Sequence, residues 1–97
     1  MESVKRLEIV IESVYLRTIV AAMKDAGATG YTVMHDITGT GDRGERRGDG
    51  LTDLSRNVII IAAVPHETAD AVLDAVQTVM KDTGGICLVS DAQWLRH

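Results

Sequence analysis

Hydrophobic and polar residues alternate near the start of the chain, where Leu7, Ile9 and Ile11 are separated by single residues. This period of two is typical of a β-strand with one buried face. Three later segments of mostly apolar residues also have the length of a strand. The sequence therefore predicts four strands, over residues 4–11, 31–36, 57–64 and 86–89.

Between these strands, apolar residues recur at the helical spacing i, i+3, i+4 and i+7. In the first such segment Ser13 offers an N-cap and Gly27 a stop. In the second, Pro65 and His66 open the helix and Gly84 ends it. The apolar stripes are Leu16, Ile19, Val20 and Met23 in the first helix, and Ala69, Val72, Leu73, Val76 and Met80 in the second.

The resulting order, βαββαβ, predicts a single ferredoxin-like α+β domain over residues 1–97. Two right-handed crossovers would place both helices on one face of the sheet. Residues 58–64 are nevertheless apolar on both faces, and strands of that kind are normally covered on both sides. In a chain this short we expect another copy to be the cover, so the sequence predicts a homo-oligomer.

Composition and charge narrow the class of protein. With 97 residues and a net charge of −4, the chain lacks the positive surplus used to bind nucleic acids or anionic membranes. Its single cysteine, Cys87, excludes an intrachain disulfide and a Cys-based zinc site, and we expect it to be a small buried apolar residue. The longest apolar run, 58–65, is far shorter than the ~20 residues of a membrane span, and residues 1–6 lack a signal-peptide core. We therefore expect a soluble, cytoplasmic protein without a metal and without membrane insertion.

A long polar segment, 38–56, separates the second and third strands. It holds five of the nine glycines and four of the seven arginines, but no lysine. Glycine lets a backbone approach a ligand closely, and arginine binds phosphate or carboxylate oxygens in a bidentate manner. The segment therefore predicts an anion or phosphate site at its base, with the loop ordering on binding; a solvated loop without a ligand is the alternative. No Gly-Lys-Ser/Thr follows the glycines, which argues against P-loop nucleotide hydrolysis.

Candidates for catalysis are few. His35 and Asp36 are neighbours on a predicted strand and should point to opposite faces, so a surface histidine is the favoured interpretation. No Ser/His/Asp or Cys/His pattern has matched spacing. We expect Trp94 to pack at an edge or an interface, with stacking on a base as the less favoured interpretation. The sequence thus indicates a protein without enzymatic activity.

Two motifs resemble those of the PII signalling superfamily. Gly30-Tyr31-Thr32-Val33-Met34 leads into Gly39-Thr40-Gly41, and Gly41-Asp42-Arg43-Gly44-Glu45-Arg46 follows. The resemblance covers residues 6–95 and is closest to the PII-like carbon branch, which includes the regulators of bicarbonate transporters and the carboxysome-associated PII protein. It implies a homotrimer with three clefts between subunits, each binding an adenine nucleotide. It also implies a T-loop, about residues 38–56, that reports which ligand is bound.

The resemblance further implies roles for particular residues. The phosphates would meet the base of the T-loop at Gly41, Asp42, Arg43 and Arg46. Gly85 would contact the nucleotide from the neighbouring subunit, Thr32 would lie near the adenine, and Arg96 would reach a phosphate. Bicarbonate would be a second ligand, held by Thr40, Gly41 and Arg46. The segment 81–85 is shorter than the B-loop of nitrogen-sensing PII proteins, which argues against tight binding of ATP and 2-oxoglutarate.

We therefore expect a nucleotide-sensing regulator of inorganic-carbon metabolism. ADP or AMP would bind, and the T-loop would present a surface to a transporter or carboxysome protein, with the regulator cytoplasmic or carboxysome-associated. Two alternatives stay open, a purely structural trimeric assembly component and a small acylphosphatase-like hydrolase. The hydrolase would need a phosphate-binding loop with an arginine directly after the first strand, and residues 11–14 contain neither glycine nor arginine.

Overall fold

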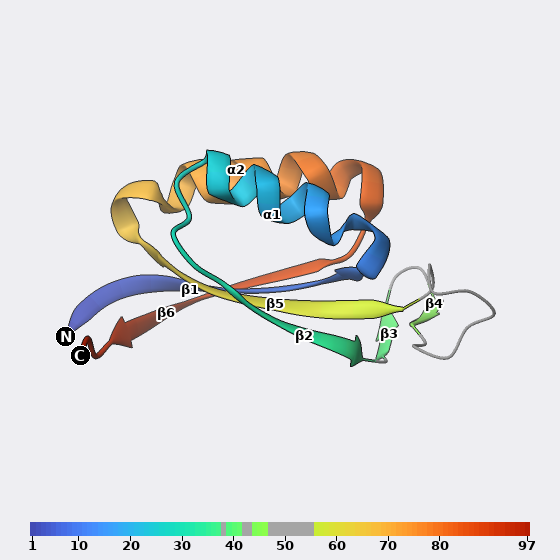
Figure 1. Ribbon diagram of the computed structural model, residues 1–97, viewed down its shortest axis with the longest axis horizontal. Helices are drawn as coiled ribbons and strands as arrows, with labels where there is room; N and C mark the ends of the chain where they lie inside the picture. The colour runs from blue at the N-terminus through green and yellow to red at the C-terminus, as the bar shows by residue number, and fades with distance from the viewer. Residues whose placement is uncertain (38, 42–43, 47–55) are drawn as a thin grey trace.

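Four strands form one antiparallel sheet with the order β2-β5-β1-β6, and both helices lie on the same face of it (Figure 1). The computed structural model describes residues 1–37, 39–41, 44–46 and 56–97, with 39–41 and 44–46 described by their backbone alone. The strands of this sheet are β1 (Glu2–Glu12), β2 (Thr32–Ile37), β5 (Asn57–Pro65) and β6 (Ile86–Trp94), and the helices are α1 (Leu16–Asp25) and α2 (His66–Thr83). The predicted ferredoxin-like βαββαβ fold is confirmed.

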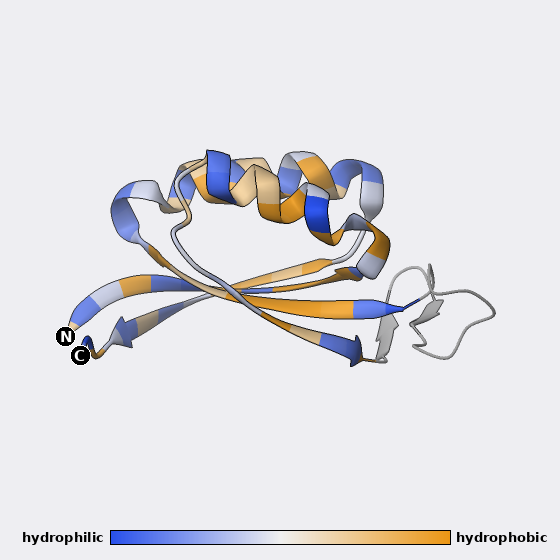
Figure 2. Cartoon of the chain, viewed as in Figure 1, coloured by the Kyte–Doolittle hydropathy of each residue, from blue (hydrophilic) through white to orange (hydrophobic). Residues whose placement is uncertain are grey.

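The core lies between the sheet and the helices, because the period of two in the central strands turns one face of each toward them. Leu7, Ile9 and Ile11 of β1 are at most 1 % exposed. Their register partners on β5 are Ala62, Ile60 and Val58, which are buried as well. The apolar residues of β5 form an almost continuous orange run in Figure 2, which explains why this strand stands out so clearly in the sequence.

The two helices begin in different ways. Helix α2 follows Pro65 directly, as predicted. Ser13, however, is not an N-cap: it is the first residue of a short 3-10 helix, η1 (Ser13–Tyr15), and the α-helix starts only at Leu16. The backbone N–H of Ser13 donates to the carbonyl of Arg56 at 2.7 Å, so this turn is tied to the start of β5 instead of being capped by a side chain. Among the described residues, neither helix is long and apolar enough to cross a membrane.

Strand β6 is longer than predicted and continues through polar residues to Trp94. It lies at the edge of the sheet, where polar side chains are tolerated and where β1 supplies partners for them. Lys5 Nζ donates to Asp91 Oδ1 at 2.6 Å, and Arg96 Nε donates to Glu2 Oε1 at 2.7 Å. The hydrogen bond from Lys5, together with its charge, holds the pKa of Asp91 below its ordinary value.

The segment that the sequence predicted to be a loop contains a short hairpin. Its strands are β3 (Gly39–Gly41) and β4 (Gly44–Arg46), paired antiparallel with Thr40 opposite Glu45. The glycine content of this segment concealed these strands, because glycine lowers strand propensity. The hairpin follows β2 almost directly and lies at the end of the molecule opposite the two termini (Figure 1).

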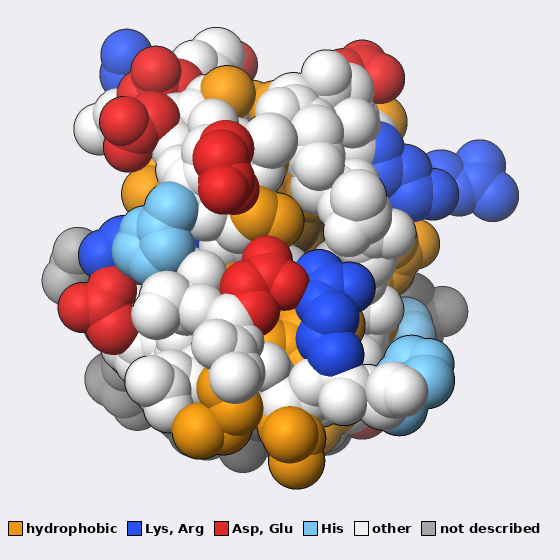
Figure 3. Space-filling view, turned by 90° about the vertical axis from the view of Figure 1, so that its left-hand side faces the viewer, with side chains coloured by type: hydrophobic (Ala, Val, Ile, Leu, Met, Phe, Trp, Pro, Cys, Tyr) orange, Lys and Arg blue, Asp and Glu red, His pale blue; other side chains and the backbone are white. Residues whose placement is uncertain are grey.

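The face of the sheet turned away from the helices, called here the outer face, is left open by the described part of the chain. Met34 of β2 and Leu88 of β6 lie on it and are 46 % and 60 % exposed. The outer face is apolar on β5, as the sequence indicated, but on β1 it carries an ion pair between Arg6 and Glu8. Figure 3, which views the end carrying both termini, shows apolar side chains along the lower edge, away from the helices.

Candidate functional site

The β3–β4 hairpin carries the backbone of three predicted site residues, Thr40, Gly41 and Arg46. Gly39 is paired with Arg46 and Gly41 with Gly44, so Thr40 and Gly41 lie on the strand opposite Arg46. Asp42, Arg43 and the expected ordering of the T-loop by a ligand lie outside the described residues. The hairpin thus brings the backbone of the predicted bicarbonate residues into one small unit.

The two ends of the T-loop are held together just before the hairpin. Asp36 has φ of 58°, and the register of β2 with β5 shifts between His35 and Ile37, which is a β-bulge. The Oδ1 of Asp36 lies 3.3 Å from Nη1 of Arg56, the last residue of the predicted T-loop. This pair closes the base of the T-loop by joining its last residue to a residue two positions before its start.

The bulge also changes the surroundings of His35. Simple alternation would send His35 and Asp36 to opposite faces, but the bulge interrupts it, and both residues line one shallow pocket of about 250 Å³. The pocket is polar and lies beside the T-loop base. Its lining residues are Ser13, His35, Asp36, Arg56, Asn57 and Val58.

Gly85 lies at the same end of the sheet as the hairpin, because the next residue, Ile86, is paired with Val10 near the end of β1. Its φ is +115°, and an added Cβ would come within 2.6 Å of the Val10 carbonyl oxygen and 2.7 Å of Ile11 Cγ2. The glycine is therefore required by close packing against β1 within the same chain. The contact of Gly85 with a nucleotide from the neighbouring subunit stays a prediction.

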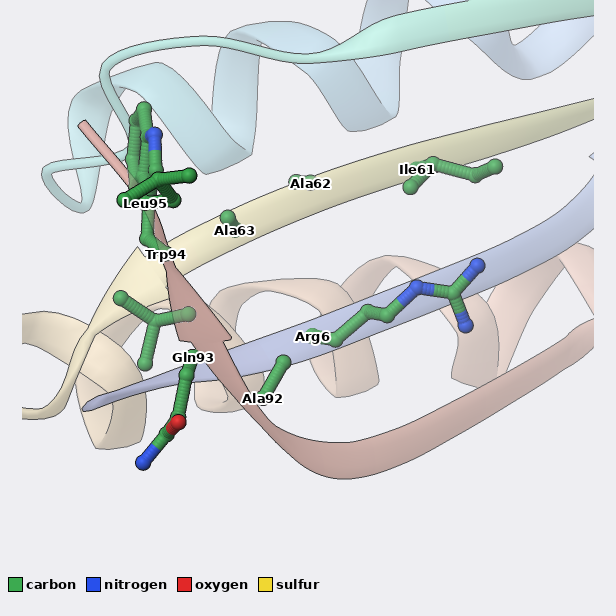
Figure 4. A pocket seen from close by; sticks show the side chains of 9 residues that line it. Arg6, Ile61, Ala62, Ala63, Ala92, Gln93, Trp94 and Leu95 are labelled. Carbon is green, nitrogen blue, oxygen red and sulfur yellow. The ribbon is translucent and has the colours of Figure 1, made fainter. Parts of the chain in front are cut away.

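Thr32 begins β2 and lines a pocket of about 310 Å³ between the α1–β2 connection and the sheet. The pocket has a floor of small and aliphatic residues on β5 and an aromatic wall from the end of β6. Its lining residues are Thr29, Gly30, Tyr31, Thr32, Ile61, Ala62, Ala63 and Trp94. An adjoining pocket of about 250 Å³, drawn in Figure 4, shares Trp94 and the same stretch of β5.

Arg96 is engaged at the end of the molecule that carries the termini. Its guanidinium carbon lies 4.3 Å from the centre of the Trp94 ring, and its Nε donates to Glu2. Strand β6 has nine residues, which at about 3.3 Å each separates Gly85 from Arg96 by roughly 30 Å. Within one chain, Arg96 and the hairpin therefore lie too far apart to hold the same small anion.

The described residues contain no group of three or more His, Cys, Asp and Glu side chains that could hold a metal ion. Cys87 is half-buried against the core, and this burial raises the pKa of its thiol. A raised pKa disfavours the thiolate, which is the nucleophilic form. The described residues thus give Cys87 no feature of an activated nucleophile.

A comparison with models of protein families bears on the whole chain. The model of the nitrogen regulatory protein P-II matches residues 4–97. The chain belongs to the P-II family. It is thus a PII-like regulatory protein. None of the curated proteins that were compared matches the chain.

Solved structures of CPII, a nitrogen regulatory PII-like protein from Thiomonas intermedia K12, are similar to this P-II protein. The structure bound to ADP, AMP and bicarbonate is 29 % identical, with a TM-score of 0.87 over 97 % of this chain and 90 % of that one. A structure bound to ADP and bicarbonate is 31 % identical, with a TM-score of 0.84 and the same coverage. The apo form is 27 % identical, with a TM-score of 0.77 over 98 % of this chain and 95 % of that one.

In this P-II protein the described site residues fall into two groups at different places on the sheet. Gly41, Arg46 and Gly85 belong to the end with the hairpin. Thr32 lines a pocket with Trp94, and Arg96 stacks on Trp94 at the end with the termini. The Asp36–Arg56 pair was not predicted from the sequence, because a β-bulge positions Asp36 and no sequence motif indicates the pair.

Proposed function

We propose that the protein is a single PII-like domain that binds ADP or AMP, with bicarbonate as a second ligand, in clefts between the subunits of a homotrimer. Its T-loop, about residues 38–56, would signal the bound state in inorganic-carbon metabolism. The observation that carries this proposal is the similarity to CPII bound to ADP, AMP and bicarbonate, over 97 % of this chain at a TM-score of 0.87.

The separation of the two residue groups supports a site made by two copies. A nucleoside diphosphate is much shorter than the roughly 30 Å spanned by β6 at about 3.3 Å per residue. A nucleotide that meets Gly85 of one copy can therefore meet Arg96 only from a second copy. Arg43 and Arg46 would bind the phosphates, and Asp42 and Gly41 would complete the T-loop base.

The open outer face supports assembly. Leu88 and Met34 are 60 % and 46 % exposed there, and burying an aliphatic side chain contributes about 1.5–3 kcal/mol. The Arg6–Glu8 ion pair on the same face satisfies its own charges, so a second copy can cover both residues without leaving an unpaired ion. A homotrimer would cover this face and create the clefts together.

Bicarbonate fits the hairpin chemically. It is a small planar anion that the guanidinium of Arg46 can bind in a bidentate manner, with Thr40 and the backbone N–H of Gly41 as further donors. By resemblance, the partner that would receive the signal is a bicarbonate transporter or a carboxysome protein. The regulator would then be cytoplasmic or carboxysome-associated.

Calorimetric titration of the wild-type protein with ADP and with AMP, each with and without bicarbonate, tests the proposed function. We expect saturable binding of ADP or AMP, and a change in affinity when bicarbonate is present. Sedimentation at micromolar concentration should give three times the 10.5 kDa chain mass. A trimer that binds no adenine nucleotide would instead identify a structural assembly component, and a 10.5 kDa monomer would contradict the clefts.

A further inference from the structure

Trp94 is the single tryptophan of the chain, and it lines both pockets near the end that carries the termini. In Figure 4 its side chain stands beside the α1–β2 connection, next to Leu95 and above the stretch of β5 that carries Ala62 and Ala63. The resemblance to the P-II family assigned no role to Trp94. Its position makes it the wall of the pocket that also contains Thr32.

We propose that Trp94 stacks on the purine base of the bound nucleotide and so favours a base-containing ligand over a bare phosphate compound. This inference rests on the proposed nucleotide site and adds to it a base-binding residue.

The shape of the pocket suits a flat aromatic group. Its volume is about 310 Å³, which lies at the lower end of the ~300–1,000 Å³ typical of small-molecule sites. Ala62 and Ala63 form part of the floor and leave room that larger side chains would fill. Tyr31 and Trp94 both line it, and bases stack on aromatic rings through their π-faces.

The Trp94 ring is held in place before any ligand arrives. Trp94 is the register partner of Glu2, and Glu2 accepts the hydrogen bond from Arg96 at 2.7 Å. The same Arg96 guanidinium lies 4.3 Å from the centre of the ring, in a cation–π contact. A ring fixed in this way loses little conformational freedom on binding, so more of the stacking energy appears as affinity. Arg96 and Glu2 are therefore positioning residues for Trp94.

The distance from the hairpin assigns Trp94 to the base and not to the phosphates. The ring lies in the group with Thr32, away from Gly41 and Arg46, so in a cleft between two copies the two groups would contact opposite ends of the ligand. Removing the ring should thus weaken the binding of ADP and of AMP by the same factor. Removing the Arg46 side chain should weaken the binding of ADP more than that of AMP, because ADP has one more phosphate.

Intrinsic fluorescence gives a direct test, because all tryptophan emission comes from Trp94. Titration of the wild-type protein with ADP should quench this emission with the same dissociation constant that calorimetry gives. Trp94→Ala should raise the dissociation constants of ADP and AMP about tenfold or more, since base–aromatic stacking is lost. Inorganic pyrophosphate should bind Trp94→Ala and the wild type equally.

Leu95→Ala is the matched control, because Leu95 is adjacent, lines only the second pocket and is 79 % exposed. It should leave the affinity for ADP unchanged. Trp94→Phe and Trp94→Leu separate stacking from packing: Phe should retain most of the affinity and Leu should not, with assembly checked by sedimentation.

Equal affinity of Trp94→Phe and Trp94→Leu for ADP would overturn the stacking role. The stacking role would also be overturned if the wild type bound ADP in calorimetry with no change in tryptophan emission and Trp94→Ala bound ADP with the same affinity. Absence of ADP binding by the wild type would instead contradict the proposed function itself. These results distinguish the two failures.

Discussion

The carboxylate of Asp36, two residues before the T-loop, lies 3.3 Å from the guanidinium of Arg56, the last residue of the T-loop, so one ion pair joins the two sides of the T-loop base. Both side chains are about half exposed, and pairs of this kind contribute about 0.2–1 kcal/mol. The pair is therefore more important for the position of the T-loop base than for stability. A second contact, from the Ser13 N–H to the Arg56 carbonyl, fixes the same point from the side of β1.

The backbone of Asp36 gives a first prediction. Its φ of 58° lies in the left-handed region, which Asp tolerates and a β-branched residue does not. Asp36→Val should lower the free energy of unfolding by about 1–2 kcal/mol. Asp36→Asn keeps a residue suited to this φ while removing the charge, so it should lower the free energy of unfolding by less than Asp36→Val does. Urea unfolding of the three proteins measures the difference, and equal midpoints would contradict the bulge.

Gly85 gives a second prediction. Its φ of +115° and the 2.6 Å approach of a built Cβ to the Val10 carbonyl mean that Gly85→Ala requires the backbone to shift. We expect it to lower the free energy of unfolding by about 1–3 kcal/mol. Gly30→Ala is the control, because no atom lies within 4 Å of a Cβ built at Gly30. Thermal unfolding should show a large shift for Gly85→Ala and almost none for Gly30→Ala.

The arginines of the T-loop give a third prediction. Hydrogen bonds to charged groups contribute about 1.5–3 kcal/mol, so Arg43→Ala and Arg46→Ala should each weaken ADP binding roughly ten- to a hundredfold. Neither should alter the melting temperature without ligand. Arg17→Ala, on the exposed side of α1, removes the same charge elsewhere and should bind ADP normally. If both T-loop variants bound ADP with the wild-type affinity, the proposed role of these arginines in phosphate binding would be wrong.

The outer face gives a fourth prediction. Leu88→Asp places a charge where a second copy would pack, and desolvating an unpaired charge is costly. We expect this variant to sediment mainly as a monomer at a concentration at which the wild type is assembled. Val14→Asp changes a similarly exposed apolar residue in η1, at 49 % against 60 % for Leu88, and should assemble normally. Assembly of Leu88→Asp like the wild type would place the interface elsewhere.

Cys87 gives a fifth prediction, on pH dependence. Burial raises the pKa of its thiol above the ordinary value, so the thiolate fraction at neutral pH is lower than that of a free cysteine. Alkylation by iodoacetamide should therefore be slower than that of glutathione at pH 8, and the gap should narrow as the pH rises through the raised pKa. A rate equal to that of glutathione at pH 8 would contradict the burial.

The layout of the fold follows from local patterns along the chain. The alternation of Leu7, Ile9 and Ile11 and the apolar run of β5 are local periodicities, and each follows from which side of an element must leave water. The motifs around Gly30 and Gly41 indicated the family, because a motif is a run of neighbouring residues and can be recognised without knowing the tertiary contacts. Both predictions are confirmed by the sheet order and by the match to the P-II family.

Contacts between distant segments determine where β6 ends, why position 85 requires glycine and which site residues share an end of the sheet. The polar end of β6 is a strand because residues far away in sequence pair with it, as Lys5 does with Asp91 across 86 positions. Gly85 is required by the carbonyl of Val10, and Arg96 lies far from the hairpin because an extended β6 separates them. The strand end, the glycine and the grouping of site residues each depend on contacts between segments far apart in the sequence, and a local pattern of polar and apolar residues does not predict such contacts.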